Sequence, residues 1–196
     1  RYVRTSKSPL SAVSISIRDS VFDHLQLGAA LNLMQQSSAA AAIAILSNAV
    51  LQTNARWEIA NCSFADSFVP AIGPVPDQVI KGVISVLLFG VESFGDAFAI
   101  RDCRFIRTVV QRAPTLNAEM VASQAIVIRS AGSEQFSPRV TIVRVSVTDS
   151  RGGIAAVFLD WMWNTINLHG QIVVQDLICA RNSLAFGGLS STSFFF

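Results

Sequence analysis

A nine-residue pattern that recurs along the chain constrains the fold more than any other feature. Its clearest copy spans residues 97–105, and related copies span residues 14–22 and 56–64. Two weaker copies follow at residues 140–147 and 172–179. The central aliphatic residues of the copies, spaced 42, 41, 42 and 32 residues apart, are Ile17, Ile59, Ile100, Ile142 and Val174. A near-constant period is typical of repeat proteins, in which each unit buries its apolar face against its neighbours.

Within each copy, polar and apolar residues alternate, which is the pattern of a strand buried on one face. A second set of aliphatic residues lies 14 residues before three of the central residues, at Ile45, Val86 and Ile128. We therefore expect equivalent strands at residues 42–46, 83–88 and 125–129. The alanine content of residues 39–46 leaves a helix as the alternative there.

The connections between these strands vary in length. Residues 67–77 and 108–122 contain prolines, which lack the N–H that a sheet requires, so we expect protruding loops. In the last unit the connection shrinks to residues 148–153, which accounts for the spacing of 32 residues. The sequence predicts an all-β fold, a right-handed parallel β-helix (solenoid) with a period of about 42 residues. We favour three short strands and one wide turn per period, while two narrower turns remain open.

Composition restricts the partners of the chain. Charged residues make up 14% of the sequence and the net charge is +2, so a nucleic-acid partner is not expected. The longest apolar runs are shorter than the roughly 20 residues that span a bilayer, so we expect no membrane span within this fragment. We interpret residues 1–196 as one β-helix segment, an interior piece of a longer solenoid whose edges are covered by neighbouring repeats of the same chain.

The pattern Ile-x-Asp/Asn-x-x-Phe, seen in residues 17–22 and 100–105, resembles the repeat of pectin-lyase-like β-helices. Over nearly the whole chain, residues 57–64 and 98–105 are similar to the dispersed gene family surface proteins of trypanosomes. That resemblance implies a large membrane protein with an adhesin-like β-helical extracellular region. It also implies a location at the cell surface and a binding role.

Asp19, Asn61 and Asp102 occupy equivalent positions in three copies. We interpret them as a structural ladder whose side chains hydrogen-bond to bend amides. The alternative is catalytic, because carboxyl groups two strands apart would be separated by about 9.6 Å, close to the spacing of an inverting glycosidase pair. Asn61 also begins a formal glycosylation sequon, whose position at a strand end argues against its use.

The cysteines and histidines suggest neither a metal nor a cofactor. Cys62 and Cys103 are equivalent residues of successive copies, and parallel side-chain vectors give poor disulfide geometry, so we expect buried free thiols. Cys179 aligns with the phenylalanines that end other copies. His24 and His169 are isolated in the sequence, and no Cys-x-x-Cys motif is present.

Candidate binding residues are arginines and tryptophans. The densest basic cluster is Arg101, Arg104, Arg107 and Arg112, which is either a solvated edge or a contact for an acidic glycan. Trp161 and Trp163 continue an apolar stripe, which favours core packing, and a sugar-stacking platform is the alternative.

The expected function is a non-catalytic surface module that binds a host glycan or protein, or serves as a scaffold. The alternative is a polysaccharide lyase or hydrolase on the same scaffold, since a fold does not dictate chemistry. Binding is favoured because the acidic residues are few and mostly spread one per repeat, whereas an enzyme gathers charged groups in one cleft.

Overall fold

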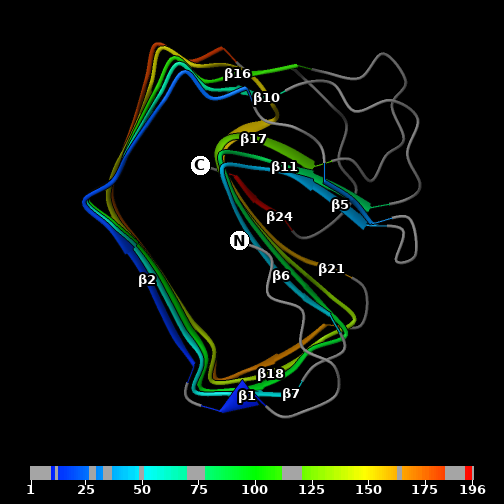
Figure 1. The fold of residues 1–196 in the computed structure, drawn as a ribbon. Coiled ribbons are helices and arrows are strands. Elements are labelled where there is room, and N and C mark those ends of the chain that lie inside the picture. Colours follow the sequence, from blue (N-terminus) through cyan, green and yellow to red (C-terminus); the bar gives the residue numbers. More distant parts are fainter. Residues whose placement is uncertain are drawn as a thin grey trace.

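The computed structural model describes residues 10–11, 13–26, 30–32, 37–48, 51–69, 78–111, 121–162, 165–183 and 193–195. Within these ranges the chain is all-β, and its sheets consist mainly of parallel strand pairs. Figure 1 shows the chain following the same outline repeatedly, so that strands far apart in the sequence lie side by side. These ranges contain no helix long and apolar enough to cross a membrane.

The nine-residue pattern forms an eight-stranded sheet that includes β2, at the left of Figure 1. Its strands are β2 (Ser14–Arg18), β3 (Val21–Asp23), β8 (Arg56–Ala60), β9 (Ser63–Ala65), β14 (Ala97–Arg101), β15 (Arg104–Ile106), β19 (Arg139–Thr148) and β23 (Gln171–Ala180). Pairing joins the predicted central residues in order, namely Ile17, Ile59, Ile100, Ile142 and Val174. The predicted alignment is confirmed, and partner strands lie one period apart.

Three further sheets complete the path of the chain. The five-stranded sheet contains β1 (Leu10–Ser11), β7 (Leu51–Thr53), β13 (Glu92–Phe94), β18 (Glu134–Phe136) and β22 (Ile166–Leu168). The three-stranded sheet contains β10 (Phe68–Val69), β16 (Val109–Val110) and β20 (Arg151–Gly152). The second eight-stranded sheet contains β4 (Ala30–Asn32), β5 (Ser37–Ala40), β6 (Ile43–Asn48), β11 (Gln78–Lys81), β12 (Ile84–Phe89), β17 (Val121–Ala131), β21 (Ala155–Met162) and β24 (Ser193–Phe195).

The second predicted set of strands is also confirmed, because Val86 pairs with both Ile45 and Ile128. Strands β5 and β6 occupy the segment for which a helix was the alternative, so that alternative is wrong.

Two details of the prediction need correction. One period holds more than three strands, since β11 to β16 all fall within a single period. Strands β10 and β16 lie in segments that the sequence predicted as loops, although both segments contain β-branched or aromatic residues. The remaining parts of those predicted loops, 70–77 and 112–120, lie outside the described residues.

The core consists of inward-facing side chains that stack on their equivalents one period away. Phe64 is fully buried and stacks between Phe22 and Phe105, with ring centroids 4.7 and 4.8 Å apart. Trp57 stacks on Phe98 at 4.5 Å in the same core. These distances match the spacing of about 4.8 Å between paired strands, so the register of the sheet sets the packing of the rings.

Candidate functional site

The strands of the main sheet are separated by corner residues in the left-handed backbone region. One line of equivalent corners, which we name the first corner column, is Asp19, Asn61, Asp102, Arg144 and Asp176. The next, the second corner column, is His24, Asp66, Arg107, Asp149 and Arg181. All ten residues have φ between 50° and 56°. Asp, Asn and His are the side chains that best tolerate this conformation, which explains their repeated occurrence here.

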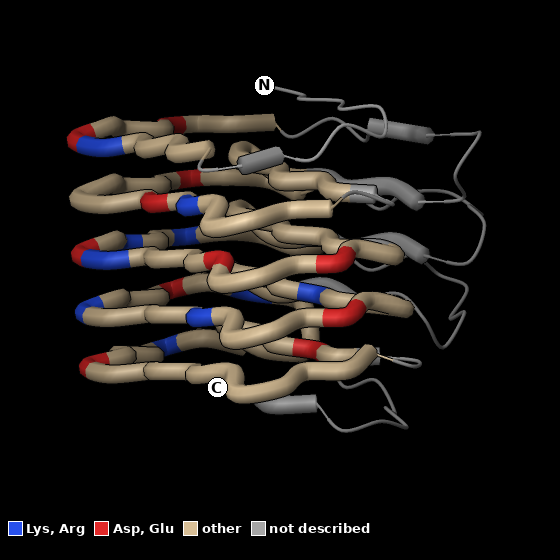
Figure 2. Tube along the Cα trace, turned by 90° about the horizontal axis from the view of Figure 1, so that it is seen from below, with Lys and Arg blue, Asp and Glu red and all other residues tan. Residues whose placement is uncertain are grey.

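Stacked corners place charged side chains beside one another. Figure 2 shows charged residues gathered along one edge of the layered chain. In the first corner column the Asn61 amide donates to Asp19 Oδ1 at 2.6 Å. Arg144 donates from Nε and Nη2 to the two Asp102 oxygens at 2.5 and 2.8 Å. The predicted ladder residues therefore bond mainly between neighbouring periods through their side chains, whereas the sequence suggested bonds to bend amides.

Arg144 also affects the acid–base behaviour of Asp102. The hydrogen bonds and positive charge of Arg144 lower the pKa of Asp102, and the carboxylate raises the pKa of Arg144 in return. Asp102 is thus held ionised, and a carboxylate with a lowered pKa is a poor proton donor near neutral pH.

The second corner column has a similar pattern of alternating charge. Arg107 donates to both Asp66 oxygens at 2.6 Å, and Arg181 donates to those of Asp149 at 2.5 and 2.7 Å. The arginine hydrogen bonds lower the pKa of Asp66 and of Asp149. Bidentate pairing of this kind holds both side chains in a fixed orientation.

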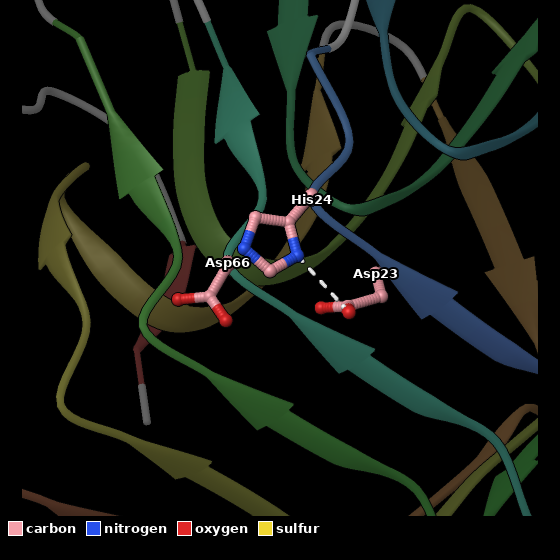
Figure 3. A group of neighbouring side chains, drawn as sticks. All are labelled: Asp23, His24 and Asp66. Carbon is pink, nitrogen blue, oxygen red and sulfur yellow. Dashed lines mark ion pairs between the residues drawn. The ribbon is translucent and has the colours of Figure 1, made fainter.

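His24, at one end of this column, lies among carboxylates. Its Nδ1 is 3.0 Å from Asp23 Oδ2, and Asp66 is the corner residue of the adjacent period. Figure 3 shows the imidazole ring between the two carboxyl groups. One ligand atom from each of Asp23, His24 and Asp66 lies within 4.8 Å of the others. The expectation that His24 is isolated is therefore wrong.

The predicted basic cluster is divided by these corners. Arg101 and Arg104 are exposed on the outer side of β14 and β15, whereas Arg107 is bound to Asp66. Arg112 lies outside the described residues. Arg56 and Arg139 are exposed on the same sheet as Arg101 and Arg104, and the sequence gave no reason to group these four residues. We call the outer surface bearing Arg56, Arg101, Arg104 and Arg139 the arginine face.

Glu58 is an acidic residue on the arginine face. It forms an ion pair with Arg18, and its second oxygen lies 4.0 Å from the Arg101 guanidinium. Among the residues that the structure describes, Arg56, Arg104 and Arg139 form no ion pair. The arginine face thus retains positive charge, unlike the corner columns, whose arginines are neutralised by aspartates.

Of the tryptophans, Trp161 packs against the core, and its indole N–H donates to Gln135 Oε1 at 3.3 Å. Trp57, a candidate neighbour for a sugar-stacking ring, is buried. Trp163 lies outside the described residues. Trp161 and the arginine face therefore belong to different sheets.

One buried carboxyl group was not anticipated from the sequence. Asp96 is 1% exposed and accepts a hydrogen bond from the Ala55 N–H at 2.8 Å. Its other oxygen has no hydrogen-bond partner among the described residues. Burial raises the pKa of Asp96 to about 6. Because the group is inaccessible, it affects stability and not the binding of a ligand.

The cysteines are free thiols, and Cys62 and Cys103 are buried. The Cys103 thiol donates to the Arg101 carbonyl at 3.2 Å, and burial raises its pKa to about 11. Cys179 is exposed. A buried thiol with a raised pKa is a poor nucleophile, so Cys103 has a packing role.

Comparisons of the chain with protein-family models, with curated proteins and with solved structures found no match. The chemistry of these sites therefore has to follow from their own geometry.

Proposed function

We propose that the chain is a segment of a right-handed parallel β-helix. Support comes from pairing at one period across all four sheets, with one period making one turn. The proposed hand follows from the strong preference for right-handed connections between parallel strands of one sheet.

We further propose that this segment is a non-catalytic surface module that binds an acidic glycan or an acidic protein surface. The observation that carries the proposal is the positive charge on the arginine face. Arg56, Arg104 and Arg139 are exposed and form no ion pair among the described residues, although aspartates neutralise arginines at the corners. An arginine that is not engaged in this way presents a planar fork of donors, which fits carboxylate or sulfate groups.

The favoured ligand is an acidic polysaccharide lying across the strands. Small outward side chains, including Ala97, Ala99 and Thr141, lie between the arginines and leave the centre of the face flat. An extended, flexible polyanion can follow such a surface without a pocket, and its acidic groups can contact several arginines at once.

The catalytic alternative, a polysaccharide lyase or hydrolase, has less support. Its candidate acid, Asp102, is bound to Arg144 and has a lowered pKa, which does not suit proton donation. The other candidate, Asp19, accepts a hydrogen bond from Asn61.

Location and neighbours belong to the same proposal. A cell-surface, extracellular position in a membrane protein would expose the arginine face to glycans. Neighbouring repeats of the same chain would cover β23, which pairs only with β19 among the described strands and exposes Ile172 and Ile178. Burying such side chains would be favourable, because apolar area removed from water stabilises by roughly 25 cal/mol per Å².

The test measures binding of the whole chain to heparin and to polygalacturonate, with new reducing or unsaturated ends measured in the same samples. Arg104→Ala and Arg139→Ala should each weaken binding at least severalfold, with no cleavage. Arg151→Ala is the matched control, because Arg151 is also exposed but lies on the three-stranded sheet. Equal losses in all three variants would indicate non-specific charge attraction and refute the assigned face. Cleavage abolished by Asp102→Asn would establish the enzymatic alternative.

A further inference from the structure

The group formed by Asp23, His24 and Asp66 has the donor atoms of a metal site. It offers one imidazole nitrogen and two carboxylates, and one ligand atom of each residue lies within 4.8 Å of the others. The residues come from different parts of the sequence. Asp23 ends β3, whereas His24 and Asp66 are consecutive members of the second corner column. The fold, and not a local loop, brings them together (Figure 3).

We propose that Asp23, His24 and Asp66 bind a divalent transition metal ion of the Zn²⁺ class, a function separate from that of the arginine face. Mixed nitrogen and oxygen donors suit Zn²⁺ and Cu²⁺, whereas Mg²⁺ and Ca²⁺ favour oxygen ligands alone. Three protein ligands leave a coordination position for water or for a group of a bound partner.

The geometry requires only small side-chain rotations. Ligand atoms about 2.0–2.2 Å from Zn²⁺ in a tetrahedral site are separated by roughly 3.3–3.6 Å, less than the 4.8 Å limit of this group. The side chains of Asp23 and His24 are exposed, with exposed fractions of 54% and 77%, so both can rotate without disturbing the core. The backbone of His24 is fixed, since its N–H donates to the Ala65 carbonyl at 3.1 Å.

Arg107 competes with the metal for Asp66. Its guanidinium contacts both Asp66 oxygens at 2.6 Å, and its charge repels a cation. Each carboxylate oxygen has a second lone pair, so Asp66 can bind a metal while it keeps one hydrogen bond from Arg107. The competition predicts weak to moderate affinity in the natural chain and a gain when the charge of Arg107 is removed.

The test is isothermal titration of the whole chain with ZnCl₂ near neutral pH. We expect one site, and we expect His24→Gln and Asp66→Asn each to weaken binding at least about tenfold. Arg107→Gln should tighten it severalfold. A purely structural role for the column does not predict that increase.

Two controls identify the source of any signal. His169→Gln removes the other histidine, which also lies at an exposed corner with a positive φ. Cys179→Ser removes the exposed thiol, another Zn²⁺ ligand. Binding unchanged in both supports the assigned site. Equal losses from His24→Gln and His169→Gln, loss of binding in Cys179→Ser, or no binding by the natural chain and Arg107→Gln would overturn the proposal. Circular dichroism of each variant separates loss of a ligand from loss of fold.

Discussion

The carboxyl group of Asp96 should make the stability of the chain depend on pH in a particular direction. Its folded-state pKa is about 6, against a value of 3.8 for an ordinary aspartate. A shift of about two units corresponds to about 3 kcal/mol, most of it developing between about pH 4 and about pH 7. Because the folded-state pKa is raised, this contribution to stability is present below pH 3.8 and is lost as pH rises through 6.

Asp96→Asn isolates this effect. The amide keeps an oxygen that can accept the Ala55 N–H but does not ionise. The unfolding free energy of the variant, minus that of the natural chain, should therefore rise by roughly 2–3 kcal/mol between about pH 4 and about pH 7. Urea titrations at several pH values measure this difference, and any constant cost of the new amide cancels from it.

Asp176→Asn is the matched control, because Asp176 is an exposed corner carboxylate. Its difference curve should be nearly flat over the same range. A flat curve for Asp96→Asn as well, or one that falls with pH, would refute the argument that burial controls the charge of Asp96.

Three further predictions follow from packing and exposure. Phe64→Ala should destabilise the chain by about 3–5 kcal/mol, since the ring is fully buried between two others, whereas Phe94→Ala, which removes a ring 43% exposed, should cost much less in urea unfolding. Gly152→Ala should lower the melting temperature, because a Cβ there would lie 1.9 Å from a backbone carbonyl oxygen at φ +83°; an unchanged melting temperature would contradict this. In native protein, Cys179 should react with a thiol reagent and Cys103 should not, as mass spectrometry of alkylated peptides can measure; equal labelling would refute the assigned burial.

The register of the strands could be predicted because the strongest signal in the sequence is also the main structural constraint. Ile17, Ile59 and Ile100 recur at the period at which the strands pair. A one-residue slip would turn every buried side chain outward, so the apolar alternation specifies the alignment. The short strands β10 and β16 were missed because two residues carry too little alternation to identify a strand.

The candidate metal site was missed for a different reason, although the necessary signal was present. Asp66 follows His24 by 42 residues, which is one period. Applying the period to polar residues as well as to the apolar ones would have brought the two together. The ion pairs between corner residues were also accessible in this way, since Asp102 and Arg144 are separated by the same interval. Burial of Asp96 could not be predicted, because it depends on which side of a corner faces the core.

The corners explain why structural ladders and candidate ligand sites use the same residue types in this fold. A left-handed corner favours Asp, Asn and His, and stacking places each corner side chain beside its equivalent one period away. Where the neighbours have opposite charges, as in Asp149 and Arg181, the side chains satisfy each other and the column is closed. Where a histidine meets carboxylates, as at His24, the same stacking leaves a set of converging donor atoms. The identity of the residue one period away therefore decides whether a corner stabilises the stack or is available to bind a ligand.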